Sequence, residues 1–227
     1  MRILALETTE AIGTVAAMCD GKLLAELTLE LRLRSAQSLA PGMKALLEQV
    51  DWRTGDVDLV AVTVGPGSFT GLRVGVTAAK TFAYAAQAEV MGLDTLEVIA
   101  AGAPEEIDLL STAVDAQRGD VVAAFFRREA NGNLHSSGPA ELVSLDAWLS
   151  NLPSGIWLCG PVLKKLAGRV PANLKTVDSR FWAPRASTVA QLAVRYHAAG
   201  RRDDLWSLLP HYCRRSAAEE KWEKKDA

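Results

Sequence analysis

The sequence has few residues that could bind metal ions or form disulfide bonds. It contains three cysteines and three histidines among 227 residues. The cysteines lie far apart and form no C-x-x-C pair, which is typical of free thiols in a reducing compartment. The histidines lack the H-x-x-x-H or H-E-x-x-H spacing that holds an ion from one helix face. We therefore predict neither a disulfide framework nor a metal site.

Long apolar runs and an excess of one charge are also missing. The charge-free run 59–72 contains three glycines and a proline, so it is too short and too broken to span a bilayer as a helix. The apolar start of the chain is too short for a signal peptide and is interrupted by Glu7. Lys plus Arg number 25 against 27 Asp plus Glu, which argues against a strongly basic nucleic-acid clamp. We expect a cytoplasmic protein that does not bind membranes.

Hydrophobic periodicity divides the first half of the chain into the order β-β-β-α-β-α-β. Short apolar runs predict strands, Asp20-Gly21 predicts a hairpin turn, and apolar residues recurring with a 3.6-residue period predict helices. The expected elements are strands over 2–8, 13–19, 23–31, 58–64 and 90–93, and helices over 38–50 and 70–87.

The second half repeats this order in a shorter form. The repeat places Glu7 opposite Asp115 and Gly13 opposite Gly119, although a chance succession of α/β units is the alternative. We expect strands over 109–114, 121–127, 134–142, 156–159 and 174–177, and helices over 146–150, 162–167 and 188–199.

Two such lobes in tandem describe an α/β fold of the two-lobed, actin-like (ASKHA, RNase H-like) class with a shortened second lobe. A boundary near Gly102-Ala103-Pro104 predicts an N-terminal lobe over 1–103 and a smaller C-terminal lobe over 104–216. The charged segment 217–227 is predicted to be a mobile tail.

In that fold the first hairpin turn of each lobe faces a cleft that binds nucleotide phosphates. Here the first turn has no glycine between Glu7 and Gly13, and the second, which starts at Asp115, lacks a glycine pair. Close approach of backbone amides to phosphate usually needs glycine, so we favour structural turns over working phosphate loops. The candidate nucleotide-facing residues are Glu7, Thr8, Gly65, Gly67, Ser68 and Asp115.

The most unusual segment is Gly65–Arg73 (GPGSFTGLR), between a predicted buried strand and a helix. Ser68 or Thr70 could cap the helix, whose free N–H groups beside Arg73 would form an anion site. The alternative is a tight turn whose glycines allow close packing, and the residues alone leave both open. The serine-hydrolase and P-loop motifs do not match here.

Helix 70–87 is apolar over much of its circumference, with two separate apolar stripes. One stripe can cover the helix's own sheet, and the other needs a further layer or a second protein. We expect a partner surface formed by the two helices of the first lobe. Its predicted residues are Leu39, Met43, Leu46, Arg73, Val74, Ala78, Thr81 and Phe82.

Four segments, ILALET (3–8), GPGSFTGLR (65–73), DAQRG (115–119) and PHYCRRS (210–216), resemble the TsaB (YeaZ) family in order and spacing. The resemblance implies a non-catalytic partner of the paralogous transferase TsaD. That enzyme makes N6-threonylcarbamoyladenosine next to the anticodon of tRNAs that read codons beginning with A. It also implies a TsaE-like ATPase as a further partner and self-association as a homodimer through the first-lobe helices. Contact with tRNA would be only indirect, through the complex. No cofactor of its own is implied, and ATP with Mg²⁺ would bind only in the complex.

Two enzymatic alternatives remain at this stage. An independent actin-like phosphotransferase would use Glu7 or Asp115 to position Mg-ATP. A glycoprotease-like peptidase would need Ser68 as its nucleophile, yet no histidine is placed by the sequence to activate it.

Overall fold

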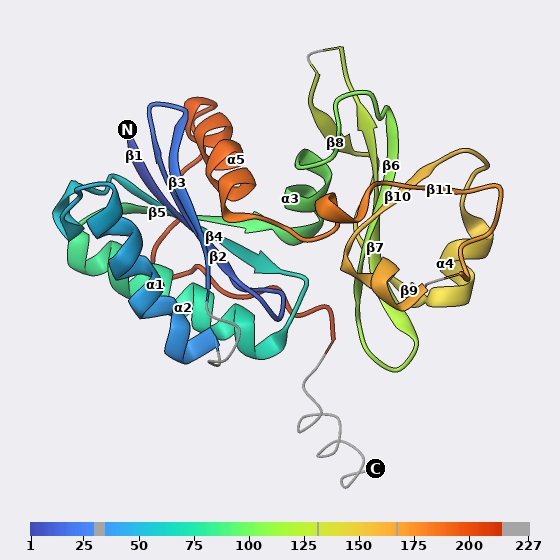
Figure 1. Cartoon of the computed structure of the whole chain (residues 1–227), viewed down its shortest axis with the longest axis horizontal. Coiled ribbons are helices and arrows are strands. Elements are labelled where there is room, and N and C mark those ends of the chain that lie inside the picture. The colour runs from blue at the N-terminus through green and yellow to red at the C-terminus, as the bar shows by residue number, and fades with distance from the viewer. Residues whose placement is uncertain (30–34, 131, 167, 215–227) are drawn as a thin grey trace, which may run out of the picture.

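The protein consists of two lobes, each built on one mixed β-sheet (Figure 1). The computed structural model describes residues 1–29, 35–130, 132–166 and 168–214, so the predicted tail 217–227 lies outside the described residues. Within these ranges no helix combines the length and the apolar character needed to cross a bilayer.

The first lobe contains the predicted β-β-β-α-β-α-β order. Its elements are β1 (Arg2–Glu7), β2 (Thr14–Cys19), β3 (Lys22–Thr28), α1 (Ser35–Gln49), the 3₁₀ turn η1 (Thr54–Asp56), β4 (Leu59–Gly65), α2 (Phe69–Ala86) and β5 (Glu89–Asp94). The sheet order is β3-β2-β1-β4-β5. Strands β1, β3, β4 and β5 run in the same direction, and β2 is antiparallel to its neighbours β1 and β3. Asp20 and Gly21 have φ angles of 47° and 77°, as the predicted hairpin turn requires.

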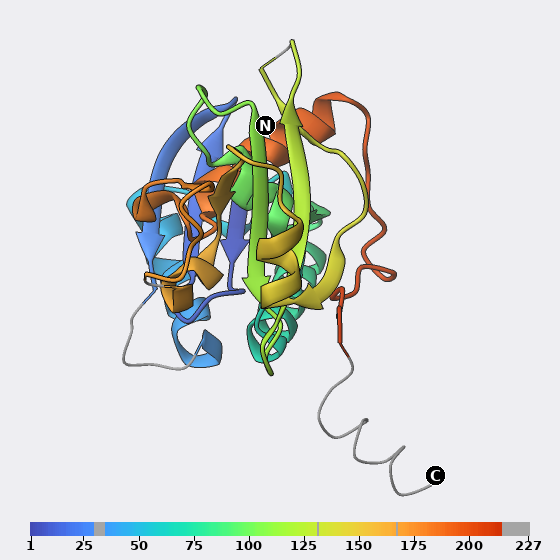
Figure 2. The same cartoon turned by 90° about the vertical axis from the view of Figure 1, so that its right-hand side faces the viewer.

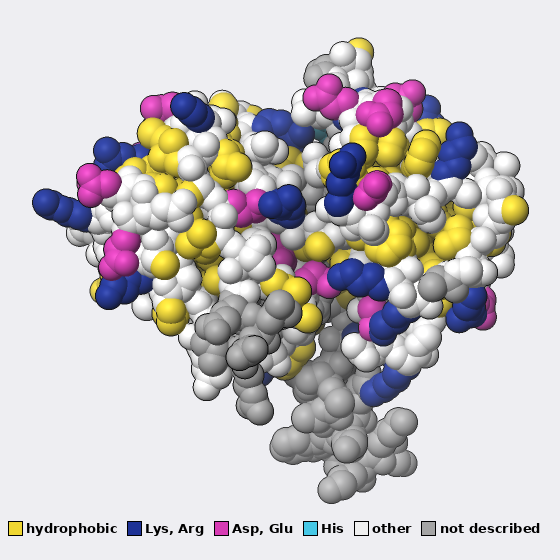
Figure 3. Space-filling view, in the orientation of Figure 1, with side chains coloured by type: hydrophobic (Ala, Val, Ile, Leu, Met, Phe, Trp, Pro, Cys, Tyr) yellow, Lys and Arg dark blue, Asp and Glu magenta, His cyan; other side chains and the backbone are white. Residues whose placement is uncertain are grey.

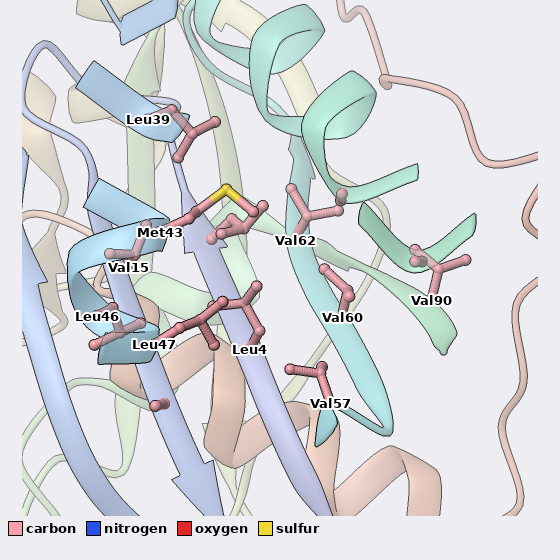
Figure 4. Close-up of a cluster of buried hydrophobic side chains, with 14 of the residues drawn as sticks. Leu4, Val15, Leu39, Met43, Leu46, Leu47, Val57, Val60, Val62 and Val90 are labelled. Carbon is pink, nitrogen blue, oxygen red and sulfur yellow. The ribbon is translucent and has the colours of Figure 1, made fainter. Parts of the chain in front are cut away.

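Helices α1 and α2 cover one face of this sheet. Figure 4 shows the apolar side chains of α1 pointing toward valines and leucines of β1, β2 and β4. Because β1 and β4 are apolar on both faces, the opposite face also needs a cover.

The second lobe repeats the plan with shorter helices. The elements after β5 are α3 (Thr95–Ala101), β6 (Leu109–Asp115), β7 (Asp120–Arg128), β8 (Leu134–Ser136), β9 (Glu141–Ser144), α4 (Leu145–Asn151), β10 (Trp157–Cys159), η2 (Pro161–Leu166), β11 (Lys175–Thr176), η3 (Ser179–Phe181) and α5 (Ala186–Ala198). The sheet order is β11-β10-β6-β7-β8, and β9 also pairs with β7. The predicted shortening is confirmed, since α4 has 7 residues against 15 in α1.

Two elements differ from the sequence prediction. The expected strand 134–142 is two short strands, both paired with β7. Helix α3 was not predicted, although it begins with a recognisable cap, because the Asp94 carboxylate accepts the N–H groups of Leu96 and Glu97 at 2.8 and 3.0 Å. An acid at the N-cap followed three residues later by glutamate is a helix-start signal.

Helix α5 lies within the predicted C-terminal range 104–216 but packs against the sheet of the first lobe. Its apolar face, which includes Val189 and Ala193, forms one cluster with Ile3, Ala16 and Ala61 of the first sheet. Small side chains let the helix lie close to the sheet and close its second apolar face. The periodicity predicted the helix but could not indicate which sheet it covers.

After α5 the chain returns along the first lobe (Figure 2). We call residues 200–214 the strap. Asp203 forms an isolated bridge with Val90 on the edge strand β5, and the Lys80 ammonium of α2 donates to the carbonyl oxygens of Trp206 and Leu208, each at 3.0 Å. The strap therefore covers the β5 edge and one flank of α2.

The start of α2 lies very close to the loop that follows β1. Thr8 is fully buried, and its hydroxyl donates to the Gly71 carbonyl oxygen at 2.8 Å. A Cβ atom at Gly71 would overlap the Thr8 carbonyl oxygen, and one at Gly75 would overlap the Thr8 hydroxyl. Only glycine permits this contact.

We expect Gly71→Ala to destabilise the protein. Glycine to alanine inside a helix normally stabilises by about 1 kcal/mol, but the overlap with Thr8 should reverse the sign and lower the free energy of unfolding by about 1–3 kcal/mol. Urea unfolding followed by circular dichroism measures the change. Gly55→Ala is the control, because a Cβ there meets nothing within 4 Å. A Gly71→Ala protein as stable as the wild type would contradict this account of the packing.

Candidate functional site

A largely apolar groove of about 700 Å³ runs between α1 and α2. Its floor and walls come from both helices and from the segment after α1. The lining residues are Ala40, Met43, Lys44, Leu47, Glu48, Trp52, Arg53, Thr54, Ala78, Thr81, Phe82 and Ala85. A concave apolar surface with a few charged side chains among its lining residues is typical of a binding site.

Helix α2 supplies the groove with its second apolar stripe. The stripe containing Leu72, Val76, Ala79 and Ala83 is buried against the sheet. Ala78 and Phe82 are half-buried and line the groove, and Thr81 is exposed beside them. The tertiary structure thus decides which of the two predicted stripes is turned away from the sheet.

Four of the predicted surface residues do not line the groove. Leu39 and Leu46 are core residues, with only 2% and 0% of their surface exposed, so their assignment to a partner surface is wrong. They belong to the face of α1 that covers the sheet (Figure 4). Met43 is 7% exposed and still contributes to the groove. Val74 packs against the core cluster without lining the groove.

Arg73 lies on the other flank of α2, against the strap. Its guanidinium carbon is 4.0 Å from the centre of the Phe69 ring, and its Nε donates to the Tyr212 hydroxyl at 3.0 Å. The rings of Phe69 and Tyr212 are 4.7 Å apart. Sequence reasoning missed the strap, although the apolar cluster LWSLLP (205–210) directly after four charged residues could have drawn attention to it.

Glu7 ends β1 at the position expected to face a nucleotide. The side chain is fully buried, and its Oε1 accepts hydrogen bonds from the backbone N–H of Thr9, at 2.6 Å, and from the Thr9 hydroxyl. Oε2 has no hydrogen-bond partner among the described residues. Burial raises the pKa of Glu7 from 4.5 to about 7, against the opposing effect of the Thr9 hydrogen bonds. A carboxyl group enclosed in this way is poorly placed to hold a solvated metal ion.

The other residues of the predicted nucleotide-facing turns are occupied by protein contacts. Gly67 packs against the Thr9 side chain, and Gly65 against the backbone of His211 in the strap. The Ser68 hydroxyl accepts the Gly71 N–H at 3.2 Å and caps α2, as predicted. These contacts favour the interpretation of GPGSFTGLR as a tight turn that allows close packing.

Ion pairs engage the acidic residues between the lobes. Lys165 donates to Asp115 at 2.6 Å, and Lys164 lies 3.8 Å from Glu10 of the opposite lobe. Arg214 at the end of the strap pairs with Asp120 in the turn that follows β6. Figure 3 shows basic and acidic side chains interspersed over both lobes on this face. Within the described ranges, no group of three His, Cys, Asp or Glu side chains is arranged to hold a metal ion.

Comparisons with known proteins agree with this geometry. The family model "TsaD: tRNA N6-adenosine threonylcarbamoyltransferase" matches residues 30–156. The "tRNA threonylcarbamoyladenosine biosynthesis protein TsaB" of Bacillus subtilis (strain 168) is 30% identical over 98% of both chains. The protein of the same name from Escherichia coli (strain K12) is 28% identical over 99% of this chain and 98% of its own.

The solved structures support the fold. "YeaZ from Pseudomonas aeruginosa" superimposes with a TM-score of 0.79 at 24% identity, covering 93% of this chain and 99% of that one. The predicted two-lobed, actin-like α/β architecture is confirmed. Given this fold and the likeness to TsaB relatives along the whole chain, the protein belongs to the TsaB (YeaZ) family.

Proposed function

We propose that this chain is a non-catalytic subunit that binds a TsaD-like transferase through the groove between α1 and α2. The complex would make N6-threonylcarbamoyladenosine next to the anticodon of tRNAs that read codons beginning with A. Family membership supports the pathway, because the full-length relatives are named for the synthesis of this modified nucleoside. The match of the TsaD model to residues 30–156 supports a partner related to this chain.

The apolar groove is the observation that carries the proposal. In a monomer, Ala85 and Thr81 of α2 face solvent beside the half-buried Phe82. Covering this surface with the helices of a partner removes apolar area from water, at roughly 25 cal/mol per Å². The same surface would support a homodimer in the absence of the transferase, so the two assemblies would compete.

A non-catalytic role agrees with the contacts of the residues that a phosphotransferase or a peptidase would use. Glu7 is buried, Asp115 is bound by Lys165, and Ser68 caps a helix. None of these side chains is free to act on a substrate in the way that a phosphotransferase or a peptidase requires. We place the complex in the cytoplasm, with a TsaE-like ATPase as its third member and ATP with Mg²⁺ bound only in the assembly.

We expect Ala78→Asp and Thr81→Asp to abolish the complex with the transferase at micromolar concentration. Each would bury an unpaired carboxylate in an apolar interface, at a cost of several kcal/mol. Light scattering over a concentration series, with and without the transferase, gives the mass of each assembly. Thr81 is exposed in the monomer, so its substitution should leave folding intact.

Ala198→Asp is the matched control, because Ala198 is an exposed alanine on α5. It should bind the transferase as the wild type does. Folded groove variants that still form the complex would show that the partner binds elsewhere. Wild-type protein that forms no complex would contradict the proposed function.

The Glu7→Gln variant tests the burial of Glu7 through the pH dependence of the free energy of unfolding. Since the folded-state pKa of Glu7 is raised from 4.5 to about 7, the folded protein retains a proton that the unfolded chain has lost. The wild type is therefore destabilised as pH rises through this window. We expect the stability advantage of Glu7→Gln over the wild type to grow by roughly 2–3 kcal/mol from pH 5 to pH 8, measured by urea unfolding.

The same variant should leave the rate of tRNA modification by the complex unchanged. Glu106→Gln, which alters an exposed carboxylate outside the groove, is the control and should show no such pH-dependent gain. A large loss of activity in a stable Glu7→Gln complex would give Glu7 a chemical role and contradict the proposal.

A further inference from the structure

The most exposed large apolar side chains among the described residues lie on α2 and the strap, outside the groove. Trp206, Tyr84 and Leu209 are 71%, 66% and 64% exposed, whereas the other large apolar residues that stay exposed reach only 39–43%. Tyr84 and Trp206 are in contact, with ring centres 5.7 Å apart. We call Tyr84, Trp206, Leu209 and Tyr212 the aromatic ridge.

The ridge follows α2 from one end to the other. The strap runs antiparallel to the helix, from Trp206 beside Tyr84 to Tyr212 beside Phe69. Those two helix positions are 15 residues apart, which corresponds to about 22 Å at 1.5 Å per residue. The exposed side chains together present on the order of 500 Å² of surface, which is as large as the apolar patches that mark interaction sites.

The ridge is held in place before any partner binds. The backbone N–H of Trp206 donates to the Asp204 carboxylate at 3.1 Å, and the Trp206 carbonyl oxygen accepts a hydrogen bond from Lys80. Tyr212 is fixed by Arg73 and by its stacking on Phe69. Ordered aromatic side chains lose little conformational entropy on association, and tryptophan and tyrosine are the residue types that dominate protein interfaces.

The chemistry of the ridge favours a protein over RNA. Its largest exposed surfaces are the rings of Trp206 and Tyr84, which an apolar protein surface could cover. The exposed Asp204 carboxylate, which accepts the backbone N–H of Trp206, would repel a phosphate group at that end.

We infer that the aromatic ridge is a second contact for the same TsaD-like transferase that occupies the groove. This inference rests on the proposed function. The ridge continues the groove across α2, because Ala85 lines the groove and the adjacent Tyr84 belongs to the ridge. The TsaD family model matches residues 30–156 and does not include the strap, whereas the likeness to the TsaB relatives extends over it. The ridge would thus give this chain a contact with the transferase in addition to the groove between α1 and α2.

The test measures transferase binding by isothermal titration with Leu209→Asp and with the double variant Trp206→Ala/Leu209→Ala. We expect the dissociation constant to rise at least tenfold for both, and the mass of the chain alone to stay unchanged. Leu209 is 64% exposed, so the single variant Leu209→Asp should remain folded. Leu142→Ala, at a leucine of the second lobe that is 43% exposed, is the control and should bind normally.

The other outcomes distinguish failure of the ridge contact from failure of the proposed function. Normal binding by ridge variants, with binding abolished in Ala78→Asp, would overturn the ridge contact and leave the proposed function standing. No binding by the wild type would remove both. Loss of the homodimer alone would make the ridge a self-association surface. Reduced cross-linking of tRNA with unchanged transferase affinity would assign it to RNA, and both results would overturn the inference.

Discussion

The contact between Thr8 and the first turns of α2 fixes the geometry on which the first lobe depends. The absence of a Cβ at Gly71 and Gly75 lets the loop after β1 touch the helix backbone, and the Thr8 hydroxyl bonds to the Gly71 carbonyl. Because one end of α2 is anchored in this way, its buried stripe lies on the sheet and its second stripe faces α1. The groove and the burial of Glu7 both follow from this arrangement.

Helix α2 serves the fold and the proposed binding function with different faces. Small residues such as Ala79 and Ala83 lie against the sheet, Phe82 borders the groove, and Lys80 holds the strap. The turns that the sequence predicts to face a nucleotide are filled here by contacts within the chain. A fold by itself does not confer an activity, and the binding surfaces proposed for this chain lie on α1, α2 and the strap.

Most elements could be predicted from the sequence, because hydrophobic period and turn residues are local properties. Strands β1 and β2, the Asp20-Gly21 hairpin and the Ser68 cap agree with the structure. Helix α3 was missed because its seven residues are too few to show a clear period. The partner surface was only partly predicted, since the period of α1 identifies an apolar face without indicating what covers it.

The sequence by itself determined the fold class, the repeated order of elements and the resemblance to the TsaB family, because these depend on patterns within short segments. The tertiary structure alone decided that α5 covers the first sheet, that Leu39 and Leu46 are core residues, and that the strap lies along α2. Such contacts join residues far apart in the chain. They depend on which apolar surfaces remain uncovered once the sheets have formed, and local sequence patterns do not specify these surfaces.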